Sequence, residues 1–340
     1  DNHCILHFYP FIIIYNLTIS YPKINGIFLP VEFQRKKILS TYPWLVHKKL
    51  PFIISADYDG LICASFLHHH LGWELAGYYN LTSLWLSEKA KKNSDNLIWV
   101  DLNILSTQGR AIGGHIVSPN GEFPKGFKSS CNPNIMANLN ADRFKDKFPF
   151  STLIFLLWLH DIQIEKELLA RMLVLHSDAS WLKYQEYGDN VNKWISGLEN
   201  YDWKWLFQKA NSVTFEKRID EILYPELKKI GAVSGLSKLS SKRLNIKSRQ
   251  FQFNPDWDED IILNLFRLFG NKLKWTPPSL PQINHRIDGT REKISLSKVK
   301  EIGLSKFLKD NNIFSYAIPS PRIFNYTSFG NNKFPVESSS

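Results

Sequence analysis

The feature that most constrains the fold is an apolar strand followed at once by an acidic corner and an apolar helix. Residues 50–55 (LPFIIS) form a short apolar run rich in β-branched side chains, which is typical of a strand buried on both faces of a parallel sheet. A sharp turn follows at 56–60, and residues 61–71 have helical character up to Gly72, which ends the helix. This order predicts the first strand, turn and helix of an α/β domain.

The same rhythm continues along the next part of the chain. Strands are predicted at 74–79, 96–100 and 110–115. Alternating strands and helices indicate an open, mostly parallel sheet with flanking helices. In such sheets, ligands bind beyond the carboxyl ends of the strands. Four side chains capable of binding a ligand fall just after predicted strands: Asp57, Asp59, Asp101 and His115.

We expect three parts in the chain. Residues 1–30 are apolar and irregular and fit no element, residues 31–209 form the α/β domain, and residues 210–340 form a smaller, basic α+β region. Further helices are predicted at 31–49, 150–160, 164–175, 216–229 and 256–273. Loops are predicted at 118–140 and 276–291, and β structure at 313–329.

The charge of the chain favours an anionic partner. The 340 residues carry a formal net charge of +10, with a pI near 9.3, which suits a nucleic acid, a nucleotide or a membrane surface. A composition rich in Lys and Asn is the alternative explanation. The stretch 227–250 holds basic residues and no acidic one, so it either follows a phosphate backbone or is a solvated loop. Its basic residues are Lys228, Lys229, Lys238, Lys242, Arg243, Lys247 and Arg249.

Other patterns exclude several classes of protein. The cysteines Cys4, Cys63 and Cys131 form no CxxC pair, which argues against a cysteine zinc site and against a disulfide framework. The apolar runs at 5–14 and 152–159 are too short to span a bilayer. We therefore expect a cytoplasmic protein with no membrane span. P-loop, GxGxxG, HExxH and GxSxG motifs do not occur, so the classes that they mark have no support.

The acidic corner suggests a metal centre. Asp57 and Asp59 on one tight turn can point into one cleft, and Gly60 permits a close approach of backbone or phosphate. Hard divalent cations prefer carboxylate oxygens, and Mn²⁺ also accepts imidazole. Two such ions can stabilise both the attacking and the leaving oxygen of a phosphoester. The chemistry therefore needs several Asp residues and at least one His, brought together by the fold.

Four segments together resemble the DHH phosphoesterase superfamily, which includes RecJ-like single-strand exonucleases. IISADYDGLICASFLHHHLGWELAGYYN is similar to the first motif, NLIWVDLNI to the second and MLVLHSDASW to the fourth. The third motif, Asp-His-His in the family, corresponds to AIGGHIVSPNG and keeps only His115. Either His115 stands for the first histidine, with Ile116 in place of the second, or it stands for the second, with Gly114 in place of the first.

The resemblance implies a set of site residues. Asp57, Asp59, Asp101 and Asp178 would bind Mn²⁺, or alternatively Mg²⁺, with His115 as a further ligand or a phosphate contact. The activity would be hydrolysis of a phosphodiester in a nucleotide or a single-stranded nucleic acid. Substrate contacts are expected from Gly113 and Gly114 beside the histidine and from the basic residues Lys242, Arg243 and Arg249.

Each of these residues has a plainer interpretation. The corner aspartates could cap a helix, Asp101 could simply end a strand, and His115 and Asp178 could be solvated. The consecutive histidines at 68–70 point in different directions from a helix and are expected to be partly exposed. His176 could position a ligand, and the aromatic residues of 181–205 could stack on bases or lie in the core.

Three functions follow from the incomplete third motif. The first is an active phosphoesterase of the DHH type. The second is a catalytically inactive module on the same fold that binds nucleic acid or a protein partner. The third is a small-molecule phosphatase or cyclic dinucleotide hydrolase, for which the basic C-terminal region offers less support because it suits a polymer.

Overall fold

The computed structural model describes residues 33–105, 110–198, 200–233 and 250–330. The predicted N-terminal part, residues 1–30, lies outside the described residues. The basic side chains of Lys242, Arg243 and Arg249, expected to contact substrate, also lie outside them.

The main sheet has seven strands in the order β6-β5-β4-β1-β2-β3-β7. The five strands from β6 to β2 are parallel, whereas β3 is antiparallel to β2 and β7 is antiparallel to β3. The fold is therefore α/β with a mostly parallel sheet, as the sequence predicts. The strands are β1 (Pro51–Ser55), β2 (Glu74–Tyr79), β3 (Ser83–Ser87), β4 (Ile98–Val100), β5 (Arg110–Ile112), β6 (Ser130–Cys131) and β7 (Ile283–Asp288).

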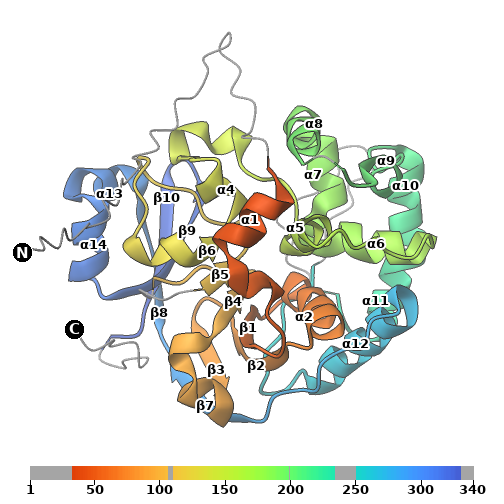
Figure 1. Ribbon diagram of the computed structural model, residues 1–340, viewed down its shortest axis with the longest axis horizontal. Coiled ribbons are helices and arrows are strands. Elements are labelled where there is room, and N and C mark those ends of the chain that lie inside the picture. The colour runs from red at the N-terminus through yellow and green to blue at the C-terminus, as the bar shows by residue number, and fades with distance from the viewer. Residues whose placement is uncertain (1–32, 106–109, 199, 234–249, 331–340) are drawn as a thin grey trace, which may run out of the picture.

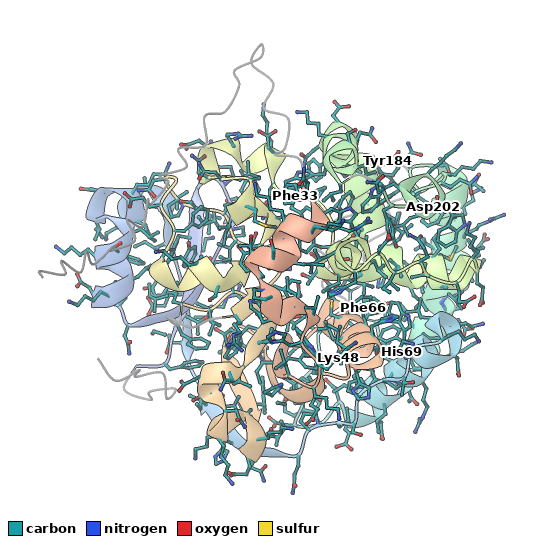
Figure 2. All side chains as sticks on the ribbon, in the orientation of Figure 1. Phe33, Lys48, Phe66, His69, Tyr184 and Asp202 are labelled. Atoms are coloured by element: carbon teal, nitrogen blue, oxygen red, sulfur yellow. The ribbon has the colours of Figure 1, made fainter. Side chains whose placement is uncertain are left out.

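Both faces of β1 are buried, which explains its unbroken apolar sequence. Phe52 and Ile54 point into the larger core, and Ile53 points into a smaller core on the opposite face. The larger core lies under helices α2 (Tyr58–Leu71), α5 (Thr152–Leu159), α6 (Leu168–His176) and α12 (Glu259–Leu273). Figure 2 shows the side chains that fill the space between these layers, among them the buried Phe66 of α2.

Helix α2 is apolar around most of its circumference because it packs against β1 on one side and against α5 and α12 on others. Asp57 is its N-cap, and Gly72 ends it in the left-handed conformation at φ 66°. In α5, every residue from Thr152 to Leu159 is buried. The two central helices are thus fixed by packing, and both begin at the carboxyl edge of the sheet.

A second, three-stranded antiparallel sheet covers part of the other face. It contains β8 (Thr290–Ser295), β10 (Ile323–Ser328) and β9 (Ile313–Ser320), with α13 (Leu296–Ile302) and α14 (Leu304–Asp310) beside it. Figure 1 shows this unit on the opposite side of the main sheet from α6 and α12. Main-chain pairing between Ile104 and Ser315, and a hydrogen bond of 2.6 Å between the Tyr79 and Ser315 hydroxyls, join the two sheets.

The remaining α-helices of the described ranges pack around these layers. They are α1 (Arg35–Thr41), α3 (Glu88–Lys92), α4 (Pro133–Met136), α7 (Ser180–Glu186), α8 (Gly188–Gly197), α9 (Trp203–Leu206), α10 (Val213–Arg218) and α11 (Tyr224–Lys229). Helix α3 lies against the sheet on the face of the smaller core. Trp181, Trp194 and Trp203 are buried in the core, so the core interpretation of these aromatic residues is confirmed. None of the helices in the described ranges has the length and apolar character needed to cross a bilayer.

Two predicted loops are wrong. The segment 118–140 contains β6 and α4, and the segment 276–291 contains β7 and the start of β8. β6 is only two residues long, so its side chains show no pattern. β7 is an edge strand with alternating half-buried and exposed residues (INHRID), and its polar positions resemble a loop. β3, which no sequence pattern indicated, was also missed.

Candidate metal centre

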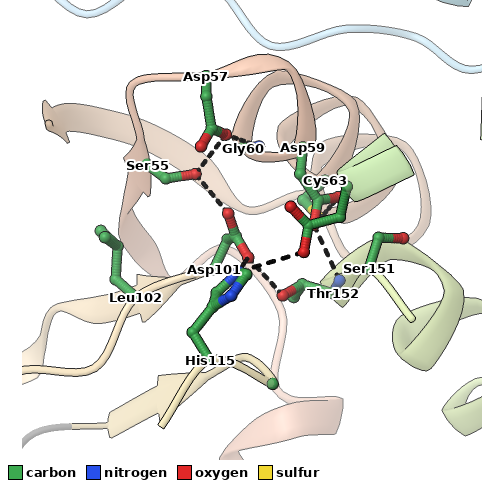
Figure 3. A network of polar contacts seen from close by, with 12 residues as sticks. Ser55, Asp57, Asp59, Gly60, Cys63, Asp101, Leu102, His115, Ser151 and Thr152 are labelled. Atoms are coloured by element: carbon green, nitrogen blue, oxygen red, sulfur yellow. Dashed lines mark hydrogen bonds and ion pairs between the residues drawn. The ribbon is translucent and has the colours of Figure 1, made fainter. Parts of the chain in front are cut away.

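The connections of the sheet reverse direction between β1 and β4, at the position that corresponds to the ligand crevice of open α/β sheets. From β1 the chain continues to β2 and β3 on one side, and it then returns to β4 on the other side of β1. This reversal is the point at which open α/β sheets bind ligands. Asp57 and Asp59 follow β1, Asp101 follows β4 and His115 follows β5, so the topology brings these side chains toward one edge (Figure 3).

Asp57 serves as a helix cap. Its Oδ1 accepts hydrogen bonds from the Gly60 backbone N–H at 3.0 Å and from the Ser55 hydroxyl at 2.8 Å. Gly60 is required here, because a Cβ on this residue would lie 2.1 Å from the Ser55 carbonyl oxygen. The corner is therefore a tight joint between β1 and α2, and the cap interpretation of Asp57 is confirmed.

Asp59 is buried against the start of α5. Its Oδ2 accepts a hydrogen bond of 2.9 Å from the Thr152 backbone N–H, and its Oδ1 accepts hydrogen bonds from the Leu153 backbone N–H and the Ser177 hydroxyl. Amide groups at the beginning of a helix stabilise a negative charge. Asp59 is thus held in one orientation by α5 and by the segment after α6.

Asp101 lies at the centre of the network shown in Figure 3. Ser55 Oγ lies 2.7 Å from its Oδ2, so the single hydroxyl proton of Ser55 is shared between Asp57 and Asp101. Thr152 donates to its Oδ1 at 2.6 Å, and His115 Nε2 lies 2.7 Å from the same Oδ1. The backbone of Asp101 is left-handed, with φ 61°. Side chains from three separate elements therefore fix the orientation of this carboxylate.

His115 joins Asp101 to Asp178. Its Nε2 lies 3.6 Å from Asp178 Oδ2, and Lys183 Nζ lies 3.2 Å from that same oxygen. His115 faces the carboxylates, whereas Ile116 is buried in the core. Of these two neighbours, His115 is therefore the one whose side chain could bind a metal together with the carboxylates.

The two glycines before His115 have a packing role. A Cβ on Gly113 would lie 3.3 Å from the Asp101 Cα, and a Cβ on Gly114 would lie 2.7 Å from Cδ1 of Phe148. Both glycines are buried. They allow the chain after β5 to approach the Asp101 turn closely, which brings His115 to the carboxylates.

The electrostatics of the cluster favour a cation. Burial raises the pKa of Asp59 well above its ordinary value, and the charges of Asp101 and Asp178 raise it further, although the Ser177 hydrogen bond opposes them. Burial alone would lower the pKa of His115, but the Asp101 and Asp178 charges outweigh it, so this pKa is raised. The carboxylates of Asp59, Asp101 and Asp178 are therefore close enough to favour a proton or a cation between them.

One ligand atom each from Asp59, Asp101 and His115 lies within 4.8 Å of the other two. Two carboxylates and one imidazole form a donor set that suits Mn²⁺ and other hard or borderline divalent cations. The residues present therefore fit a metal ion. Asp57 and Asp178 lie at the margin of this group, one as a helix cap and the other paired with Lys183.

Several residues that build the centre carry no sequence signal. Ser55, Thr152, Ser177 and Lys183 contact the carboxylates. Ser55 and Ser177 lie within the first and fourth family-like segments but were not singled out, and Thr152 and Lys183 lie outside the quoted segments. Only the proximity of Lys183 to Asp178 in sequence is a hint. Hydroxyl groups are common throughout proteins, so contacts of this kind become visible only in three dimensions.

The other histidines lie outside the centre. His176 is fully buried and packs edge-on against Tyr58 and Tyr224, and its ring nitrogens have no hydrogen-bond partner in the described part of the chain. The possibility that it positions a ligand therefore has no support from its described contacts. His68, His69 and His70 are partly exposed, as expected, near the end of α2.

Comparison of this chain with protein-family models, with curated proteins and with solved structures finds no match.

Proposed function

We propose that this chain is a DHH-like, metal-dependent phosphoesterase that hydrolyses a phosphodiester in a nucleotide or a single-stranded nucleic acid. The observation that carries the proposal is the Asp59–Asp101–His115 group at the reversal point between β1 and β4. The four family-like segments of the sequence support it, because their aspartates and His115 converge there.

The cation would be Mn²⁺, with Mg²⁺ as the alternative, and it would activate water and stabilise charge on the phosphoryl oxygens. Asp59, Asp101 and His115 would hold it. The start of α5 fixes Asp59, while Ser55 and Thr152 orient Asp101. Lys183 contributes positive charge beside Asp178, at the side of the centre that an anionic substrate would approach.

Calorimetric titration with Mn²⁺ tests the metal centre. Wild-type protein should bind Mn²⁺, and Asp59→Asn should lose this binding. Circular dichroism must show that the variant is folded, because both oxygens of Asp59 accept backbone N–H groups and the new amide group would face one of them. Asp142→Asn is the matched control, since Asp142 is 72% exposed and pairs only with Lys300 at the surface. Absence of binding to folded wild-type protein would refute the proposal.

Hydrolysis is then measured with a chromogenic phosphodiester and with short single-stranded oligonucleotides. Turnover should depend on Mn²⁺ and should be lost in Asp59→Asn and in Asp101→Asn. Full activity in Asp101→Asn would show that the residues are assigned wrongly.

A second candidate function is a catalytically inactive module that binds nucleic acid. It is favoured by the bonds that Asp57 and Asp178 make inside the protein, because these leave a smaller ligand set than a two-metal centre uses. This candidate predicts oligonucleotide binding that weakens steeply with salt and no metal-dependent turnover.

A further inference from the structure

A basic pocket lies among α6, α9 and α10, apart from the candidate metal centre. Figure 1 shows these three helices together on one side of the molecule. The pocket has a volume of about 210 Å³, and its polar lining consists of Arg171, Gln208, Lys209, Ser212, Thr214 and Arg218. Three of these six side chains are cations, and none is a carboxylate.

Arg171 is the buried member of this group, with only 8% of its surface exposed. Its guanidinium lies between two aromatic rings, 5.2 Å from the Phe215 centroid and 5.9 Å from the Trp205 centroid. Its Nη1 donates a hydrogen bond of 3.2 Å to the Trp205 carbonyl oxygen. Its Nε is buried and has no hydrogen-bond partner among the described residues.

Within the described residues, no carboxylate pairs with the cations that line the pocket. Across the described ranges, no carboxylate lies within ion-pair distance of Arg171, Lys209 or Arg218. The acidic residue one turn before Arg171 is Glu167, and it pairs instead with Lys272 at 3.0 Å. A buried guanidinium without an anionic partner is strongly unfavourable, so the arrangement indicates that an external anion completes it.

We propose that this pocket binds a phosphate group. An arginine guanidinium pairs well with a tetrahedral oxyanion through parallel N–H donors, and the Arg171 side chain lines the pocket. Lys209 and Arg218 add two further positive charges, which suits a phosphate of charge near −2 better than a monovalent carboxylate. Gln208 and Thr214 offer additional donors, whereas the Ser212 hydroxyl already donates to the Lys209 carbonyl.

The proposal is independent of the metal centre, because no metal ligand lines the pocket. The test is therefore calorimetry in the presence of a chelator, with inorganic phosphate titrated against chloride at constant ionic strength. Wild-type protein should bind phosphate. Arg218→Gln should weaken binding about tenfold or more, since it removes a charged contact. Arg218 is exposed, so this variant leaves the core intact.

Lys217→Gln is the matched control. Lys217 is exposed and adjacent to Arg218 but does not line the pocket, so its phosphate affinity should stay within about twofold of wild type. Arg171→Gln should abolish binding, with circular dichroism confirming that the variant is folded. Equal losses in Lys217→Gln and Arg218→Gln would overturn the proposal, because they would mean nonspecific screening of charge.

Two sources of the phosphate can be distinguished with the same variants. Binding of inorganic phosphate would assign the pocket to the free ion. Binding of a nucleoside 5′-monophosphate, but of neither inorganic phosphate nor the nucleoside, would assign it to the terminal phosphate of a nucleotide. Absence of binding for all three ligands would overturn the proposal.

Discussion

The two ends of α6 support groups of opposite charge. Arg171 lies at the end of the first turn of α6, and Asp178 follows its last residue, His176. A cation near the beginning of a helix and an anion after its end both oppose the helix dipole. Neither Arg171 nor Asp178 is therefore placed where it stabilises the helix. In both regions, the charged side chain is explained by its interactions with groups outside the helix.

The two regions differ in how their charge is supported. At the candidate metal centre, carboxylates are surrounded by donors from Ser55, Thr152 and Ser177, and they are fixed at the ends of buried strands. In the basic pocket, Arg171 is fixed mainly by aromatic rings, and its Nε has no partner. The acidic centre is preorganised by hydroxyl donors, and Lys183 and His115 face its carboxylates. The Arg171 guanidinium, by contrast, has no carboxylate partner among the described residues.

The largest expected effect comes from a substitution at the joint between β1 and α2, which should change the metal centre and leave the basic pocket intact. Gly60→Ala would place a Cβ 2.1 Å from a backbone oxygen, which forces the joint open. We expect a loss of about 3 kcal/mol in the free energy of unfolding, measured with urea. Under folding conditions, Mn²⁺ affinity should fall while phosphate affinity in the basic pocket is kept.

Gly188→Ala is the control for that variant, because a Cβ there meets nothing within 4 Å. Its stability should be unchanged or slightly higher, since alanine restricts the unfolded chain. Equal losses for the two alanine variants would mean that the Gly60 contact does not define the corner.

The second-largest effect is the pH dependence of stability that arises from His160, a residue outside both regions. Burial, aided by the charges of His70 and Lys48, lowers the pKa of His160 to about 4. In the unfolded state, His160 becomes protonated near pH 6.5, whereas in the folded state it stays neutral until about pH 4. The free energy of unfolding is therefore greatest above pH 6.5, falls as the pH decreases and levels off below about pH 4.

Between pH 7.5 and pH 5, His160 should account for a loss of about 2 kcal/mol in the free energy of unfolding. His160→Phe keeps a ring beside Phe66 and should reduce this loss by that amount, as measured by urea unfolding at both pH values. The variant also allows the two regions to be compared at pH 5 with less interference from global unfolding. An unchanged pH profile would contradict the assignment.

The smallest effect sharpens the comparison by changing one hydroxyl. Thr152→Val removes the 2.6 Å hydrogen bond to Asp101 but keeps the backbone N–H that binds Asp59. Mn²⁺ affinity should fall about tenfold, as is typical when a group that orients a ligand is lost. Phosphate affinity in the basic pocket should not change, and a change there would show that the two regions are coupled.

Sequence patterns predicted part of the fold and part of the site. The apolar run before Asp57 and the glycine after α2 predicted β1, α2 and β2, because burial on both faces leaves a clear signature. The edge strand β7 gave no such signature, since half of its positions face solvent. Within the site, positions after strands identified Asp59, Asp101 and His115, but residues such as Thr152 contact them only through packing of α5.

By itself, the sequence determined the parallel core of the sheet and the placement of acidic residues at strand ends, because both depend on local apolar patterns and on chain direction. Tertiary structure alone decided which acidic residue became a helix cap, which carboxylates converged with His115, and that Arg171 was buried without an anion. The physical reason is distance along the chain. Asp59, Asp101 and Thr152 are joined by contacts between separately folded elements, and no local pattern records such contacts.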